Sequence, residues 1–163
     1  ALAQSKKSIP IIAVCACTHS LPSWKSLEDT SLVKLLLPSI LRTISSKEIQ
    51  KYNIDCEVID VQSLIPFDLS KNISKSIIKT NRLMIIDEDV PGGGSSFILQ
   101  ELLTNQDIYE HLDSKPCLVT AKEHRPPYGS DGDYISKPSF EDIFEEIYTV
   151  MNEANPNKYK KLI

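Results

Sequence analysis

The feature that most constrains the fold of this chain is the alternation of short apolar segments with longer, helix-like ones. Four segments have the apolar, β-branched composition of buried strands, at residues 8–18, 54–64, 82–87 and 116–121. The segments that connect them are long enough for the crossover helices that parallel strands require. This order predicts βαβ units. We therefore expect a three-layer α/β/α fold with about five strands in a mostly parallel sheet.

Local signals place several helices. Asp68 is expected to act as an N-cap, because its carboxylate can accept hydrogen bonds from free amides of the first helical turn. The inner face of that helix is predicted to hold Leu69, Ile73, Ile77 and Ile78. Ser139 and Asp142 have the spacing of a capping box. The helix that they open has an apolar stripe formed by Phe140, Ile143, Phe144, Ile147, Tyr148 and Met151.

Two regions depart from this regular order. Pro38 interrupts the helical pattern of residues 31–44, where a proline costs about 3 kcal/mol, so we expect a kink or two short helices. Residues 156–163 form a basic tail that we expect to be frayed. We expect one domain over residues 1–155. The chain begins with Ala1 and lacks a signal-peptide core at its start, which indicates a piece of a longer polypeptide or a processed one.

Composition excludes several functional classes. The net charge is −4, whereas nucleic-acid-binding proteins usually carry a basic surface. No apolar run approaches the roughly 18 residues that a membrane span needs, so we expect neither nucleic acid nor a membrane as partner. The cysteines lack the paired spacing of a zinc site and are expected to be buried thiols in a reducing compartment. They are Cys15, Cys17, Cys56 and Cys117.

The stretch RLMIIDEDVPGGGSSFILQELL, residues 82–103, has the layout of a ligand-binding turn. Asp87, Glu88 and Asp89 end an apolar strand, and three glycines then lead into a helix-like segment whose amides would attract an anion. However, a phosphate loop needs a lysine after its glycines. A carboxylate of the same loop could also satisfy the helix amides. Phosphate and Mg²⁺ binding stay open, but a structural or interface turn is favoured. Its residues are Glu88, Gly92, Gly93 and Gly94.

Other candidate chemistry is weaker. The first 91 residues contain no glycine, which excludes a glycine-rich dinucleotide loop after the first strand. His19 and His124 follow the first and fourth predicted strands, so both could lie at one edge of the sheet. Glu123 and His124 could form an acid–base pair, but the chain has no G-x-S-x-G nucleophile motif.

Spaced motifs give the chain a family resemblance. The segments CEVIDVQSLIPFD, KTNRLMIIDEDVPGGG, YEHLDSKPCLVTAKEHRPPY and SKPSFEDIFEEIYTVM occur in that order between residues 56 and 151. Together they resemble the C-terminal domain of the E1 β subunit of thiamine-diphosphate-dependent 2-oxo acid dehydrogenases, which has the transketolase C-terminal fold. The resemblance covers about residues 54–154 and is poor over residues 1–50.

The resemblance implies an assembly role within an oxidoreductase. The segment HRPPYGSDGDYISKP is most similar to the corresponding segment of 2-oxoisovalerate dehydrogenases, which act in branched-chain amino acid degradation. Pyruvate dehydrogenase is the alternative. In this family thiamine diphosphate and Mg²⁺ are bound outside this domain. The resemblance therefore implies that this chain holds no catalytic, cofactor-binding or metal-binding residue and that the isolated domain is non-catalytic.

The implied partners are the E1 α part, a second β part and the peripheral subunit-binding domain of the acyltransferase, E2. Asp113 matches the acid that pairs with a basic residue of that domain in relatives. The C-terminal carboxylate supplies a second contact in those relatives. The expected location is the cytoplasm of a bacterium or the mitochondrial matrix of a eukaryote. A stand-alone ligand-binding α/β module is the alternative from another class.

Overall fold

A parallel sheet forms the centre of the part of the chain that the structure describes. The structure is a computed structural model that describes residues 9–13, 49, 51–54, 56–61, 63–125 and 132–161. Its strands are β1 (Ile9–Ala13), β2 (Cys56–Asp60), β3 (Met84–Ile86) and β4 (Cys117–Val119). They lie in the order β2-β1-β3-β4, and each neighbouring pair is parallel. We expected about five strands; the described part of the chain contains four, which make a small parallel sheet in a mixed α/β fold.

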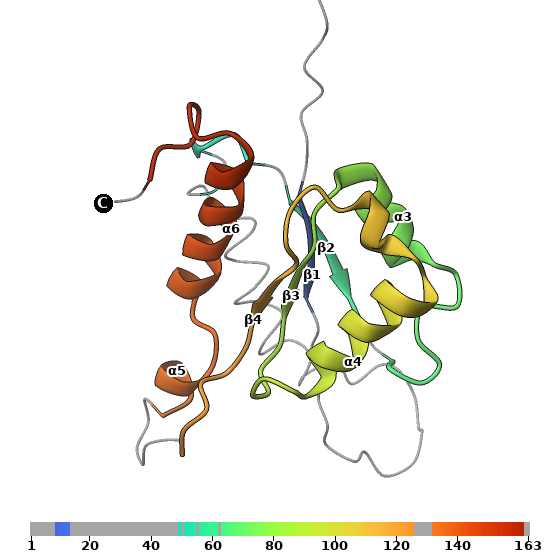
Figure 1. Cartoon of the computed structure of the whole chain (residues 1–163). Coiled ribbons are helices and arrows are strands. Elements are labelled where there is room, and N and C mark those ends of the chain that lie inside the picture. The colour runs from blue at the N-terminus through green and yellow to red at the C-terminus, as the bar shows by residue number, and fades with distance from the viewer. Residues whose placement is uncertain are drawn as a thin grey trace, which may run out of the picture.

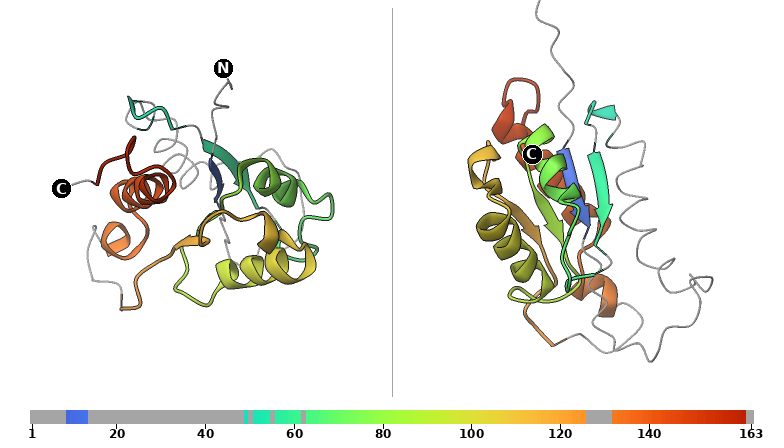
Figure 2. Two further views of the ribbon diagram at one scale, coloured as in Figure 1. Left: turned by 45° about the horizontal axis from the view of Figure 1, so that its top comes forward. Right: turned by 90° about the vertical axis from the view of Figure 1, so that its right-hand side faces the viewer.

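Helices lie on both faces of the sheet. They are α3 (Asn72–Thr80), α4 (Gly94–Gln100), α5 (Gly132–Ser136) and α6 (Phe140–Ala154). The last turn of α4 continues as the π-helix η1 (Glu101–Asn105), and the 3-10 helix η2 (Ile108–His111) follows it. Figure 1 shows α6 on one side of the strands and α3 and α4 on the other, and the turned views in Figure 2 agree.

Two apolar clusters fill the spaces between the sheet and its helices. Met84 and Ile86 belong to the cluster beneath α6, whereas Ile85 belongs to the cluster beneath α3 and α4. All three side chains of β3 are at most 2 % exposed. A strand that is buried on both faces needs an uninterrupted apolar sequence, which explains why this short segment could be recognised as a strand. Burial of each such side chain contributes about 1.5–3 kcal/mol.

Helix α6 follows its sequence pattern closely. The Ser139 side chain accepts a hydrogen bond from the Asp142 amide, and the Asp142 carboxylate accepts one from the Ser139 amide, so the predicted capping box is present. Of the predicted stripe, Phe140 and Phe144 are half-buried. The remaining four members, Ile143, Ile147, Tyr148 and Met151, are buried.

The start of α3 differs from the prediction. Asp68 does cap the helix, because its two carboxylate oxygens accept hydrogen bonds of 2.9 Å from the amides of Asn72 and Ile73. However, the helix begins at Asn72, so Leu69 lies in the preceding turn and is 82 % exposed. Ile78 is 49 % exposed. The predicted inner face is therefore correct only for Ile73 and Ile77, which are buried.

The segment after α6 packs against the molecule. Tyr159 is 3 % exposed and makes an edge-to-face contact with Tyr148, with ring centroids 6.0 Å apart. Its hydroxyl lies 3.4 Å from the carbonyl oxygen of Asn53. The expectation of a frayed tail is wrong for the part described, up to residue 161, because one aromatic ring joins the core. The predictions for Cys15, Cys17, His19 and the Pro38 helix lie outside the described residues.

Candidate functional site

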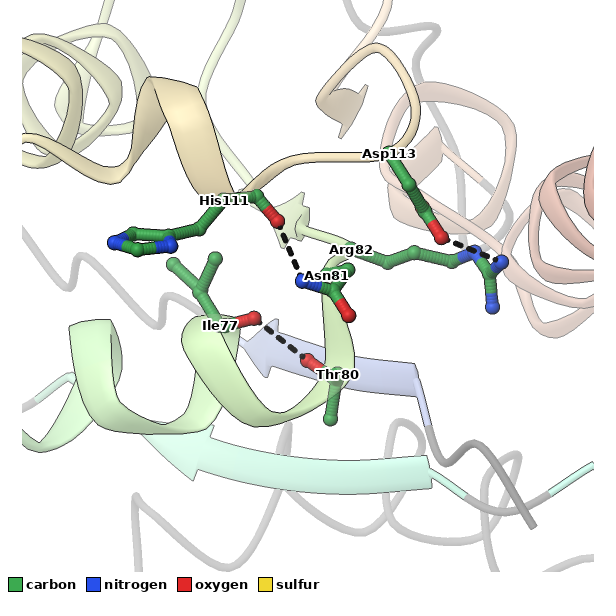
Figure 3. A network of polar contacts seen from close by, with 6 residues as sticks. All are labelled: Ile77, Thr80, Asn81, Arg82, His111 and Asp113. Carbon is green, nitrogen blue, oxygen red and sulfur yellow. Dashed lines mark hydrogen bonds and ion pairs between the residues drawn. The ribbon is translucent and has the colours of Figure 1, made fainter. Parts of the chain in front are cut away.

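Asp113 lies in the turn between η2 and β4, beside the end of α3. The Nη2 atom of Arg82 donates a hydrogen bond of 3.1 Å to Asp113 Oδ2. The Arg82 side chain is 6 % exposed, whereas that of Asp113 is 36 % exposed. The carboxylate is therefore partly open to solvent, whereas the guanidinium that pairs with it is buried. Figure 3 shows the two groups side by side, joined by this contact.

The backbone that leads to this carboxylate is fixed by Asn81. Its side-chain Nδ2 donates to the carbonyl oxygen of His111 at 2.8 Å (Figure 3). Its own carbonyl oxygen accepts from the Asp113 amide at 2.9 Å. Asn81 ends α3 in the left-handed conformation, with φ 63°, which asparagine tolerates better than most residues. The end of α3 thus sets the position of the turn that carries Asp113.

The ion pair with Arg82 gives Asp113 a role in the stability of the fold as well as a position at the surface. A buried charge is costly unless an opposite charge and hydrogen bonds compensate it. Asp113 supplies the charge, and the Nε atom of Arg82 has no hydrogen-bond partner in the structure. Loss of the Asp113 carboxylate would therefore affect the free energy of unfolding as well as any contact made at the surface.

The sequence resemblance predicts a role for Asp113, but the residues that hold it, Asn81 and Arg82, were not predicted. Asn81 could have been identified, because an asparagine directly after a helical pattern is typical of a left-handed helix end. Arg82 gave no comparable signal: it precedes an apolar strand, and its partner is 31 residues away in the sequence.

In the acidic turn after β3, the Asp87 carboxylate accepts hydrogen bonds from backbone amides of the same turn and of α4. Asp87 is 1 % exposed, and its carboxylate oxygens accept from the amides of Asp89 at 3.1 Å and Ser95 at 2.8 Å. Ser95 lies in the first turn of α4. A carboxylate of the loop itself thus satisfies this amide, which leaves less room for the anion that the motif suggested.

The glycines and Glu88 have local roles in this turn. Gly92 has φ +100°, where a side chain would be strained, and a Cβ on Gly93 would lie 2.5 Å from Asp89 Oδ2. Gly94 begins α4. Glu88 forms an ion pair of 3.2 Å with Lys137, which links the turn to the segment after α5. A subunit interface at this turn stays a prediction.

The other candidate site residues, His124 and Cys117, lie in no arrangement typical of a catalytic or metal site. Within the described ranges, no group of three or more His, Cys, Asp or Glu side chains is arranged to hold a metal ion. His124 is exposed, and its Nδ1 lies 2.9 Å from the neighbouring Arg125 carbonyl oxygen. Cys117 donates to Glu146 at 3.4 Å, and burial together with this carboxylate raises the pKa of the thiol to about 12. The thiol therefore stays protonated and unreactive at neutral pH.

One hollow lies between β4 and the first half of α6. Its volume is about 250 Å³, and its charged lining is mixed, with two lysines and three acids. These are Lys122, Lys137, Asp142, Glu145 and Glu146. Lys137 already pairs with Glu88, and Asp142 caps α6.

None of the described helices is both long and apolar enough to cross a membrane.

The fold and these motifs define a protein class. Residues 44–135, more than half of the chain, match the family described as transketolase, C-terminal domain. The chain belongs to this family.

Several relatives of this chain are named E1 β subunits. The pyruvate dehydrogenase E1 component subunit beta of Mesostigma viride is 33 % identical over 97 residues, which are 60 % of this chain and 29 % of the relative. The protein of the same name from Rickettsia conorii is 30 % identical over 131 residues, covering 77 % of this chain and 39 % of the relative. The mitochondrial form from Ascaris suum is 25 % identical over 125 residues, covering 77 % and 34 %.

The chain is thus a distant homologue of pyruvate dehydrogenase E1 β subunits and spans between 29 % and 39 % of the length of these relatives. Their names specify pyruvate, so they favour the pyruvate alternative over the branched-chain preference. The branched-chain preference comes from the sequence of residues 124–138, of which residues 126–131 lie outside the described part. The sequence of such a loop gives no direct information about a substrate pocket.

Proposed function

We propose that this chain is the C-terminal domain of the β part of a pyruvate dehydrogenase E1 component, where it serves assembly. The family match and the E1 β relatives support this proposal. Thiamine diphosphate and Mg²⁺ would be bound by other parts of the E1, together with the E1 α part and a second β part. The complete domain would be a three-layer α/β/α unit over residues 1–155 with about five strands. The complex would work in a bacterial cytoplasm or a mitochondrial matrix.

The observation that carries the assembly role is the construction of the Asp113 turn. The carboxylate is 36 % exposed, while its backbone is fixed by Asn81 and its Oδ2 atom by Arg82. A charged group that is ordered before binding loses less conformational entropy when a partner binds. We propose that Asp113 binds a basic residue of the E2 peripheral subunit-binding domain.

The test is a calorimetric titration of the full E1 with that domain. Asp113→Asn keeps a side chain of the same size that can still accept from Arg82, but it removes the charge. We expect binding to weaken by about 1–3 kcal/mol, the range for loss of a charged hydrogen-bond partner. Glu145→Gln, an exposed charge removal on α6, is the matched control and should leave the affinity unchanged. Equal affinities for the wild type and Asp113→Asn would reject the docking role.

Two competing functions have separate tests. Rates with pyruvate and with 2-oxoisovalerate, measured on the complete E1, decide between the two substrates. A stand-alone ligand-binding module would instead show saturable, micromolar binding of a nucleotide or Mg²⁺ to this chain. The capping of α4 by Asp87 gives that module little support at the acidic turn.

A further inference from the structure

Tyr109 presents its ring to solvent from an ordered turn. Tyr109 is 78 % exposed, whereas the next most exposed tyrosine among the described residues, Tyr52, is 36 % exposed. Its neighbour Ile108 is 0 % exposed and packs in the cluster beneath α3 and α4. Ile108 therefore anchors η2 to the core, while Tyr109 in the same helix points outward. A single exposed apolar residue is ordinary, so the argument depends on what surrounds this one.

Tyr109 lies in η2, which leads directly into the turn that carries Asp113. The Leu112 amide donates to the Tyr109 carbonyl oxygen at 3.3 Å, and the next amide, that of Asp113, is bonded to Asn81. His111 accepts from the Asn81 side chain. The backbone from Tyr109 to Asp113 is thus held at three points. An aromatic side chain on a fixed backbone offers a large contact area at a small cost in conformational entropy.

The charge of the segment that carries Tyr109 indicates the kind of partner that would fit it. Three exposed acids lie within the nine residues 107–115, against one exposed lysine, Lys115. The acids are Asp107, Glu110 and Asp113. Behind them, Arg82 is nearly buried and its Nε atom has no partner, so its charge is directed at Asp113 and is not offered to solvent. A surface that combines an open aromatic ring with carboxylates fits a basic partner, because a lysine or arginine can lie over the ring face as well as pair with an acid.

We propose that Tyr109 is the second anchor of the docking surface around Asp113. Its ring packs against an arginine or lysine side chain of the E2 peripheral subunit-binding domain. A basic residue of the same domain pairs with Asp113. This inference rests on the proposed docking function and adds a residue and a type of contact to it. Aromatic residues of this kind carry a large share of the binding free energy at many interfaces.

The experiment uses the full E1 and the E2 peripheral subunit-binding domain in calorimetric titrations. Tyr109→Ala should raise Kd by about tenfold, within the range for a partly desolvated cation–π contact. Tyr109→Phe should retain most of the affinity, because the ring face makes the contact. Leu69→Ala removes another strongly exposed apolar side chain, which is 82 % exposed, and should leave Kd unchanged. Because Tyr109 is so exposed, its substitution should leave the melting temperature unchanged.

The outcomes separate this inference from the proposed function. If Asp113→Asn weakens binding and Tyr109→Ala does not, the docking role stands and the role of Tyr109 is rejected. If neither variant weakens binding, both are rejected. A loss of affinity in Leu69→Ala equal to that in Tyr109→Ala would also overturn the inference, because the effect would then not be specific to this surface.

Discussion

At the scale of single residues, the ion pair between Arg82 and Asp113 combines two roles in one carboxylate. The guanidinium is 6 % exposed, and the carboxylate 3.1 Å away is the charge that the structure shows beside it. Removal of one partner of such a pair usually costs more than removal of both, because it leaves a buried charge without compensation. The surface role and the folding role of Asp113 can therefore be separated by experiment.

We predict that Asp113→Ala lowers the free energy of unfolding by about 1–3 kcal/mol, the cost of leaving a buried hydrogen-bonding group without its partner. Arg82→Met combined with Asp113→Ala should recover part of this loss, because no buried charge remains. Urea unfolding of the wild type, both single variants and the double variant measures the coupling. Additive effects of the two substitutions would show that the pair does not stabilise the fold.

Local residue signals were readable from the sequence, whereas distant ones were not. The Asp68 cap and the Ser139–Asp142 box act within five residues of chain and were predicted. The contacts Arg82–Asp113 and Asn81–His111 join residues 31 and 30 positions apart, and their formation depends on where α3 ends relative to the turn before β4. No local pattern encodes that distance.

At the scale of elements, α6 shows how a cap couples a helix to pH. Hydrogen bonds from the Ser139 side chain and amide lower the pKa of Asp142 below its ordinary value of 3.8. A carboxyl group whose pKa is lowered by folding contributes stability above its unfolded pKa, and this contribution is lost as the pH falls through its folded pKa. The capping box should therefore stabilise the protein fully at neutral pH and fail in acid.

We predict that Asp142→Asn destabilises the protein by about 1 kcal/mol at neutral pH, the typical contribution of a cap. The difference from the wild type should shrink as the pH falls below 3.8, where the wild-type carboxyl also becomes protonated. Thermal unfolding at several pH values measures this difference. Glu145→Gln, which removes an exposed carboxylate of the same helix, is the control. A destabilisation that does not depend on pH would contradict the capping mechanism.

Element boundaries show the limit of periodicity. Leu69 fits the apolar face of α3 by spacing alone, yet two residues with positive φ, Asp68 and Lys71, form a turn there and delay the helix to Asn72. The apolar pattern continues through this turn although the helix does not. In α6, by contrast, the capping box fixes the first turn, so spacing and structure agree.

At the scale of the whole molecule, the class of fold was predictable but the order of strands was not. Alternating segments imply parallel strands with crossover helices, and the sheet has them. The placement of β1 between β2 and β3 depends on pairing between segments more than 40 residues apart. The sequence also gives no sign of a substrate, because the family resemblance implies that the thiamine diphosphate chemistry lies outside this domain.

The end of the chain closes the cluster beneath α6. That cluster contains Ile49 and Ile54 from the segment before β2, the buried face of α6, and Tyr159 from the tail. The Asn152 side chain donates to the carbonyl oxygen of Tyr159, so the tail is held by its backbone as well as by its ring. The sequence predicts only a basic tail here, because one tyrosine among lysines carries no periodic signal.

We predict that Tyr159→Ala lowers the free energy of unfolding by about 3 kcal/mol, near the lower limit for truncation of a buried aromatic residue. Lys160→Ala changes an exposed neighbour and should alter it by no more than about 0.5 kcal/mol. Urea unfolding monitored by circular dichroism gives both values. Because the ring of Tyr159 contacts Tyr148 and its hydroxyl contacts Asn53, its loss should loosen two segments at once. Equal stability of the two variants would instead show that the tail contributes nothing to the fold, as its composition alone suggests.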